Sequence, residues 1–85
     1  MNKKRITITE NVRKGLIKYL TKAQHLQTID NPIHPAKLEW CVKVLNNMCN
    51  WSYQHDYFTE RQAEVTADVV KIIKKVELPK TDLPF

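Results

Sequence analysis

The side chains of this 85-residue chain best suited to metal binding or nucleophilic attack are three histidines and two cysteines. Structural zinc sites usually hold their ligands in close pairs, but no C-x-x-C or H-x-x-x-H spacing occurs here. Cys41 and Cys49 are separated by about 12 Å along a helix, which is too far for a disulfide within it. We therefore expect no metal, no other cofactor, and two buried free thiols in a reducing compartment.

Side chains that could catalyse a reaction do not form a recognisable arrangement in the sequence either. The sequence shows no paired carboxylates and no nucleophile beside a base, and its single glycine, Gly15, cannot form a glycine-rich phosphate loop. We expect a protein that is not an enzyme. Gly15 lies within a predicted helix, where it marks either a close helix contact or a weak turn.

The chain ends on the sequence TDLPF, and residues 77–85 contain two Leu-Pro pairs that predict an extended tail. Phe85 could fill an apolar pocket of a partner while its terminal carboxylate and Asp82 meet a basic residue at the rim. One buried phenylalanine contributes about 2–3 kcal/mol, and micromolar binding requires about 8 kcal/mol, so docking would need a second contact. The alternatives are a frayed terminus or Phe85 packed on its own helices.

Residues Asp82, Leu83, Pro84 and Phe85 resemble the acidic tip of bacterial single-stranded DNA-binding proteins, which ends in aspartates, an aliphatic residue, Pro and Phe. The resemblance implies docking on replication, recombination or repair enzymes. It covers only the end of the chain. Lys80 and Thr81 stand where that family has further acids, and nothing upstream resembles its oligonucleotide-binding barrel.

Positive charge is concentrated at the amino-terminal end. Of the net charge of +5, residues 1–22 carry +6 (seven bases, one acid) and residues 23–85 carry −1 (seven bases, eight acids). A concentration of positive charge attracts phosphate backbones or acidic protein surfaces. The alternative is that these residues form a basic face that contacts only solvent. The candidate binding residues are Lys3, Lys4, Arg5, Thr7, Arg13, Lys14, Lys18 and Lys22.

Residues 4–9 alternate polar and apolar side chains, which predicts a half-buried strand. A lone strand needs a partner, and we expect either the short Val-Glu-Leu segment at 76–78 or a second copy of the chain. Arg5, Thr7 and Thr9 on one face resemble the strand of ribbon-helix-helix repressors, which implies a dimer that reads the DNA major groove. That family has a tight turn into its second helix, whereas this chain has Pro32 and Pro35.

Apolar spacing predicts three helices, at about 10–26, 35–53 and 60–76, with Thr9 and Thr59 as N-caps and Pro35 in the first turn of the second. The fold class is therefore mainly α: a small three-helix bundle with a short N-terminal β-strand. The predicted organisation is one helical domain over 1–76 and an extended C-terminal tail over 77–85.

The second predicted helix is apolar on more than one side, and residues 44–54 contain no charged side chain. A helix of this kind is central to its fold or covers a partner. Trp40, Val44 and Trp51 are the candidate interface residues. Trp40 and Trp51, near Lys37 and Lys43, could also stack nucleic-acid bases, but such aromatics usually belong to a core or a protein interface.

These patterns favour a small non-enzymatic accessory or inhibitor protein of DNA replication, recombination or repair, encoded by a phage or another mobile element. Its partners would be a DNA-metabolism protein at the tail and DNA at the basic face, and a homodimer remains open. No stretch is apolar enough for a membrane span, so we expect a cytoplasmic protein. The alternatives are a dimeric ribbon-helix-helix-like repressor and an inhibitor that binds a host protein without nucleic acid.

Overall fold

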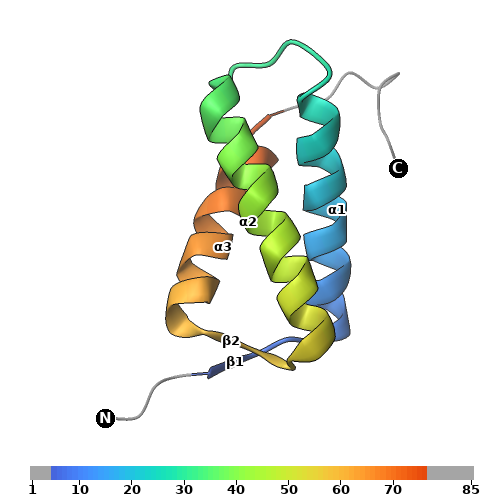
Figure 1. The fold of residues 1–85 in the computed structure, drawn as a ribbon, viewed down its shortest axis with the longest axis vertical. Helices are drawn as coiled ribbons and strands as arrows, with labels where there is room; N and C mark the ends of the chain where they lie inside the picture. Colours follow the sequence, from blue (N-terminus) through green and yellow to red (C-terminus); the bar gives the residue numbers. More distant parts are fainter. Residues whose placement is uncertain (1–4, 77–85) are drawn as a thin grey trace.

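Three helices lie side by side and a two-stranded sheet crosses one end of them (Figure 1). The computed structural model describes residues 5–76. In chain order the elements are β1 (Arg5–Thr7), α1 (Glu10–Leu26), α2 (Pro35–Gln54), β2 (Tyr57–Thr59) and α3 (Glu60–Lys74). The predicted mainly α bundle with an N-terminal strand is confirmed. The predicted tail at 77–85 and residues Lys3 and Lys4 lie outside the described residues.

The helices begin where their capping residues predict. The Thr9 hydroxyl accepts a hydrogen bond from the Val12 amide at 3.2 Å, and Pro35 is the first residue of α2. Thr59 and Gln62 form a reciprocal capping box, with distances of 3.2 Å and 2.9 Å. The predicted third helix was two residues too long, because α3 ends at Lys74 and the Val76 amide closes a final turn onto the Ile73 carbonyl.

The predicted partner of the first strand was wrong. β1 pairs with β2 of the same chain in antiparallel register, Arg5 opposite Thr59 and Thr7 opposite Tyr57. The link from α2 to α3 crosses beneath the bundle beside the start of α1 (Figure 1), which brings the two strands together. Neither the 76–78 segment nor a second copy is needed on this edge of β1. Three residues of β2 are too few for an alternating pattern to be visible in the sequence.

The core lies between the helices and is closed by the sheet. α1 contributes Leu16, Ala23 and Leu26, and α3 contributes Val69 and Ile73, all at most 3% exposed. α2 supplies the largest share, with Leu38, Cys41, Leu45 and Cys49, while Ile8 and Phe58 seal the sheet end. This packing leaves one side of α1 and one side of α2 at the surface.

Gly15 does not mark a close helix contact. A Cβ atom built at Gly15 would meet nothing within 4 Å, and the residue has no positive φ angle. We therefore expect Gly15→Ala to raise the free energy of unfolding by about 0.5–1 kcal/mol, because alanine restricts the unfolded chain and favours the helix. Urea denaturation checks this value. A loss of stability would mean that the position is tighter than the structure shows.

Candidate interaction surfaces

The α1 lysine row consists of Lys14, Lys18 and Lys22, one helical turn apart on the side of α1 away from the core. Lys14 and Lys18 are exposed and Lys22 is half-buried. The row is about 12 Å long, since eight residues each rise 1.5 Å. Glu10 is the only acid in α1, so little opposes the positive field of this helix.

The three lysines differ in the groups that they contact. The Lys18 amino group lies 5.9 Å from the centroid of the Tyr19 ring, within reach of a weak cation–π contact. Lys18 and Lys22 each interact with further groups of the protein as well. The row is therefore partly held in place by its own neighbours, and a bound anion would compete with these surface contacts, which are worth little in water.

Arg13, which the sequence assigned to the basic face, has a structural role. Its guanidinium donates from Nε to the Ser52 carbonyl at 3.2 Å and from Nη2 to the His55 carbonyl at 3.4 Å. These bonds fasten the start of α1 to the last turn of α2, where helix carbonyls lack partners within the helix. Arg13 therefore has contacts within the fold, and its predicted part in a binding surface stays a prediction.

We expect Arg13→Ala to lower the free energy of unfolding by about 1.5–3 kcal/mol, because two charge-assisted hydrogen bonds are lost. Lys14→Ala is the matched control, since Lys14 is exposed and the same charge is removed. Its effect should stay within about 0.5 kcal/mol. Equal losses in a urea titration would show that the Arg13 contacts do not hold the two helices together.

Arg5 and Thr7 are exposed on β1, but Arg5 is also engaged. Its guanidinium carbon lies 4.4 Å from the centroid of the Tyr57 ring, close enough for a cation–π interaction across the sheet. Thr9, expected on the same face, instead serves as the N-cap of α1. Arg5 and Arg13 therefore each contact other groups of the fold, while Lys14 and Lys18 of the α1 lysine row are exposed.

The residues of the predicted interface also differ in exposure and in contacts; they are Trp40, Val44 and Trp51. Trp40 is 44% exposed, while Val44 is half-buried and packs against the core. Trp51 stacks on the His55 ring with centroids 3.6 Å apart, and its Nε1 donates to the Tyr57 carbonyl at 2.5 Å. Trp51 therefore anchors β2 to α2, and its predicted part in an interface stays a prediction. No pattern in the sequence indicates this aromatic cluster, because β2 itself was not predicted.

Trp51→Phe should cost about 1–2 kcal/mol of unfolding free energy, because the Tyr57 carbonyl loses its donor while most of the ring is kept. Trp40→Phe is the matched control, and we expect it to change stability by less than about 0.5 kcal/mol. Thermal and urea denaturation of both variants measure the difference. If both tryptophans proved equally costly to replace, the anchoring role of Trp51 would be wrong.

The two cysteines are buried and free, as the spacing predicted. Burial raises the pKa of both the Cys41 and the Cys49 thiol, and at Cys41 the charge of Lys37 opposes this shift to a smaller extent. Thiols in this state are poor nucleophiles. Within residues 5–76, no three His, Cys, Asp or Glu side chains come together as a possible metal site.

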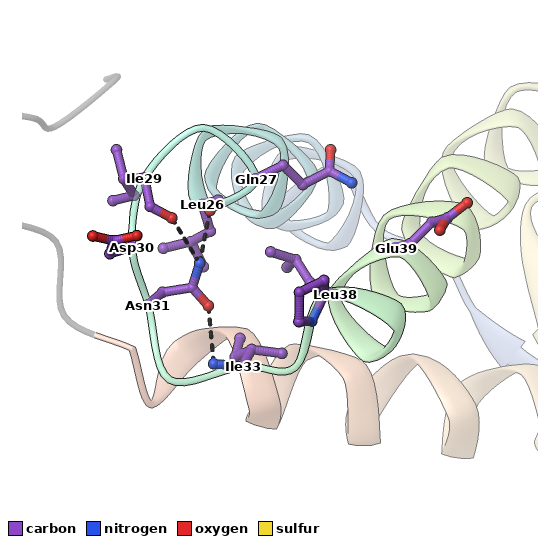
Figure 2. Close-up of a pocket in the computed structure, with 9 residues that line it drawn as sticks. Leu26, Gln27, Ile29, Asp30, Asn31, Ile33, Leu38 and Glu39 are labelled. Carbon is purple, nitrogen blue, oxygen red and sulfur yellow. Dashed lines mark hydrogen bonds between the residues drawn. The ribbon is translucent and has the colours of Figure 1, made fainter.

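A pocket of about 480 Å³ lies where α1 ends and α2 begins (Figure 2). Asn31 shapes the connecting loop, because its amide donates to the Leu26 carbonyl at 2.7 Å and accepts from the Ile33 amide at 2.9 Å. The lining is mixed: five of its nine residues are apolar, and the others are the amides Gln27 and Asn31 and the carboxylates Asp30 and Glu39. None of the nine lining residues is Ser, Cys, His or Lys.

Comparison with known proteins found no matching family model, no matching curated protein and no matching solved structure. No helix among residues 5–76 is sufficiently long and apolar to cross a membrane. The function therefore has to be inferred from the exposed side chains of the protein and from the sequence of the tail.

Proposed function

We propose that this protein is a small non-enzymatic accessory or inhibitor protein of DNA replication, recombination or repair, encoded by a phage or another mobile element. The observation that carries the proposal is the α1 lysine row, which lies on the surface of a helix that contains a single acid. In this proposal the row contacts DNA phosphates, or an acidic protein surface in their place. The two buried free thiols suit a reducing compartment such as the cytoplasm.

The second contact in this proposal is the tail, whose sequence resembles the docking tip of single-stranded DNA-binding proteins. Asp82 and the carboxylate of Phe85 would meet a base on the partner, and the phenyl ring would fill its pocket. The lysine row and the tip lie on one chain, so a partner that holds both gains the affinity that neither contact supplies alone.

A binding experiment with variants of the tail tests this docking role. Phe85→Ala should weaken binding to replication or repair enzymes that accept such tips, whereas Thr81→Ala, four residues away, should leave it unchanged. Nuclease treatment separates direct docking from binding through DNA. Equal binding of the wild type and Phe85→Ala would remove the tail from the proposal.

Two other functions were consistent with the sequence. The ribbon-helix-helix alternative is less favoured, because β1 already pairs with β2 and Arg5 lies over Tyr57. The inhibitor that binds a host protein without nucleic acid remains an alternative. Binding to DNA that weakens steeply with added salt would count against it, because counterion release accompanies phosphate contacts.

A further inference from the structure

The sheet of β1 and β2 has two outer edges, and the backbone groups on them can be assigned. The Ile8 amide donates to the Asp56 carbonyl at 2.7 Å, at the end of the antiparallel pairing of the two strands. In such a ladder every second residue turns its amide and carbonyl to the partner strand, so Ile6 does the same as Ile8. The amides and carbonyls of Arg5 and Thr7 therefore point away from β2, to the outer edge of β1.

The outer edge of β2 is closed by side chains. Its outward backbone groups belong to Tyr57 and Thr59. The Tyr57 carbonyl accepts a hydrogen bond from Trp51 Nε1, and the Thr59 amide donates to Gln62 Oε1 at 2.9 Å. A further strand could pair with β2 only by breaking these bonds. The fold therefore protects this edge of the sheet, as native proteins commonly do.

The outer edge of β1 has no such caps. Within residues 5–76, no hydrogen bond engages the outward amide or carbonyl of Arg5 or Thr7. All three residues of β1 are exposed, whereas those of β2 are buried or half-buried. An extended peptide binds to an open edge of this kind through its own amides and carbonyls. The edge of β1 is therefore available to a further strand.

Charge decides which kind of strand suits this edge. Residues 1–22 carry +6, and Lys3 and Lys4 stand immediately before Arg5 in the chain. A second copy would bring the same positive charge to its own β1, and like charges on adjacent strands repel each other. A strand with acidic side chains gains opposite-charge pairs instead. The charge of this end of the chain therefore favours an acidic partner over a second copy.

The two faces of β1 determine the order of side chains in such a partner. Arg5 and Thr7 project on one face, because successive side chains of a strand alternate. Ile6 lies opposite Phe58 on the other face, where Phe58 is buried but Ile6 is 42% exposed. An apolar side chain beside Ile6 would cover it, while acidic side chains would lie beside Arg5 and Thr7. The complementary strand therefore alternates acidic and apolar residues.

We propose that the outer edge of β1 binds an extended acidic segment of a partner protein by strand addition, with acidic and apolar residues alternating in that segment. The backbone groups of Arg5 and Thr7 form the hydrogen bonds, and Ile6 packs against the apolar residue. DNA is unsuited to this edge, because phosphates only accept hydrogen bonds whereas the edge presents donors and acceptors in turn. Since only two residues present outward groups, binding is weak, with a dissociation constant of about 1 mM.

The test is amide hydrogen exchange of the full chain, followed by NMR, with the end-blocked peptide Glu-Val-Glu-Val-Glu. At about 5 mM peptide about one sixth of the protein stays free, so the Arg5 and Thr7 amides should exchange about sixfold more slowly. The Ile6 amide, already bonded to β2, should change little. N-methylation of the glutamates removes the donors that face β1 and should abolish the effect, whereas N-methylation of the valines should preserve it. Lys-Val-Lys-Val-Lys should have no effect.

A variant of the protein tests the same edge from the other side. Thr7→Pro removes an outward donor without removing a bond to β2, and proline is tolerated at such edge positions. The peptide should then no longer slow exchange of the Arg5 amide. Thr7→Val is the matched control, because it keeps the amide, and the effect of the peptide should persist. Circular dichroism establishes that both variants are folded.

Unchanged exchange of the Arg5 and Thr7 amides with the glutamate peptide would overturn the proposal. Equal slowing by the lysine peptide, or by the peptide methylated on its glutamates, would overturn it too, because no acidic strand would then be paired with the edge. Slow exchange of both amides without peptide, increasing with protein concentration, would assign the edge to a second copy instead. None of these measurements involves DNA, so their outcome is separate from the role of the α1 lysine row.

Discussion

Leu45→Ala should lower the free energy of unfolding by about 2–5 kcal/mol, a large share of the roughly 5–15 kcal/mol that stabilises a typical domain. Leu45 is fully buried at the middle of α2, the helix that contributes most residues to the core. Truncation removes apolar contacts on this side of α2 and leaves a cavity that close-packed neighbours cannot fill. Urea denaturation followed by circular dichroism measures the change.

Ile17→Ala is the matched control for this variant, because it removes a similar side chain at a position that is 49% exposed. We expect its cost to be below about 1 kcal/mol. Similar losses for the two variants would mean that the core does not centre on α2.

Reversal of two charges in the α1 lysine row should reduce affinity for DNA by about 100-fold at low salt. Lys14→Glu with Lys18→Glu replaces two attractive charges by two repulsive ones, and a total change of about 2–3 kcal/mol corresponds to that factor. The folded state should be little affected, since both side chains are exposed. Fluorescence anisotropy with a labelled duplex and a labelled single strand measures the loss.

The control for this variant is Lys71→Glu with Lys74→Glu, which makes the same change in net charge on exposed positions of α3. A uniform electrostatic attraction would weaken equally in both double variants. A local contact through the α1 lysine row would weaken much more in the first. Equal effects would therefore contradict the assignment of binding to α1.

Local patterns in the sequence predicted most of the helical architecture. Thr9, Pro35 and Thr59 mark the starts of the helices through hydrogen bonds or torsions that involve residues at most three positions away. Helical spacing also placed Lys14 and Lys18 at the surface. Contacts between residues so close in the chain can be predicted from the local sequence pattern.

The errors concern contacts between distant residues. Arg13 reaches carbonyls 39 and 42 positions along the chain, and no periodicity reveals such a bond. β1 pairs with a strand that follows α2, and Trp51 is fixed by the same strand. Each depends on how the helices pack, because that packing brings the link between α2 and α3 beneath α1. Arg5 and Arg13 of the predicted basic cluster therefore make contacts within the fold that no local pattern indicates.

The most direct test of the central claim, that the α1 lysine row binds phosphates, is the salt dependence of DNA binding. Three phosphate contacts predict a slope of about −2.7 for the logarithm of the binding constant against that of salt concentration, at about 0.9 per contact on duplex DNA. Lys14→Gln with Lys18→Gln leaves one contact, so its slope should fall to about −0.9. A slope that is the same in both proteins, or binding that does not respond to salt, would contradict the account.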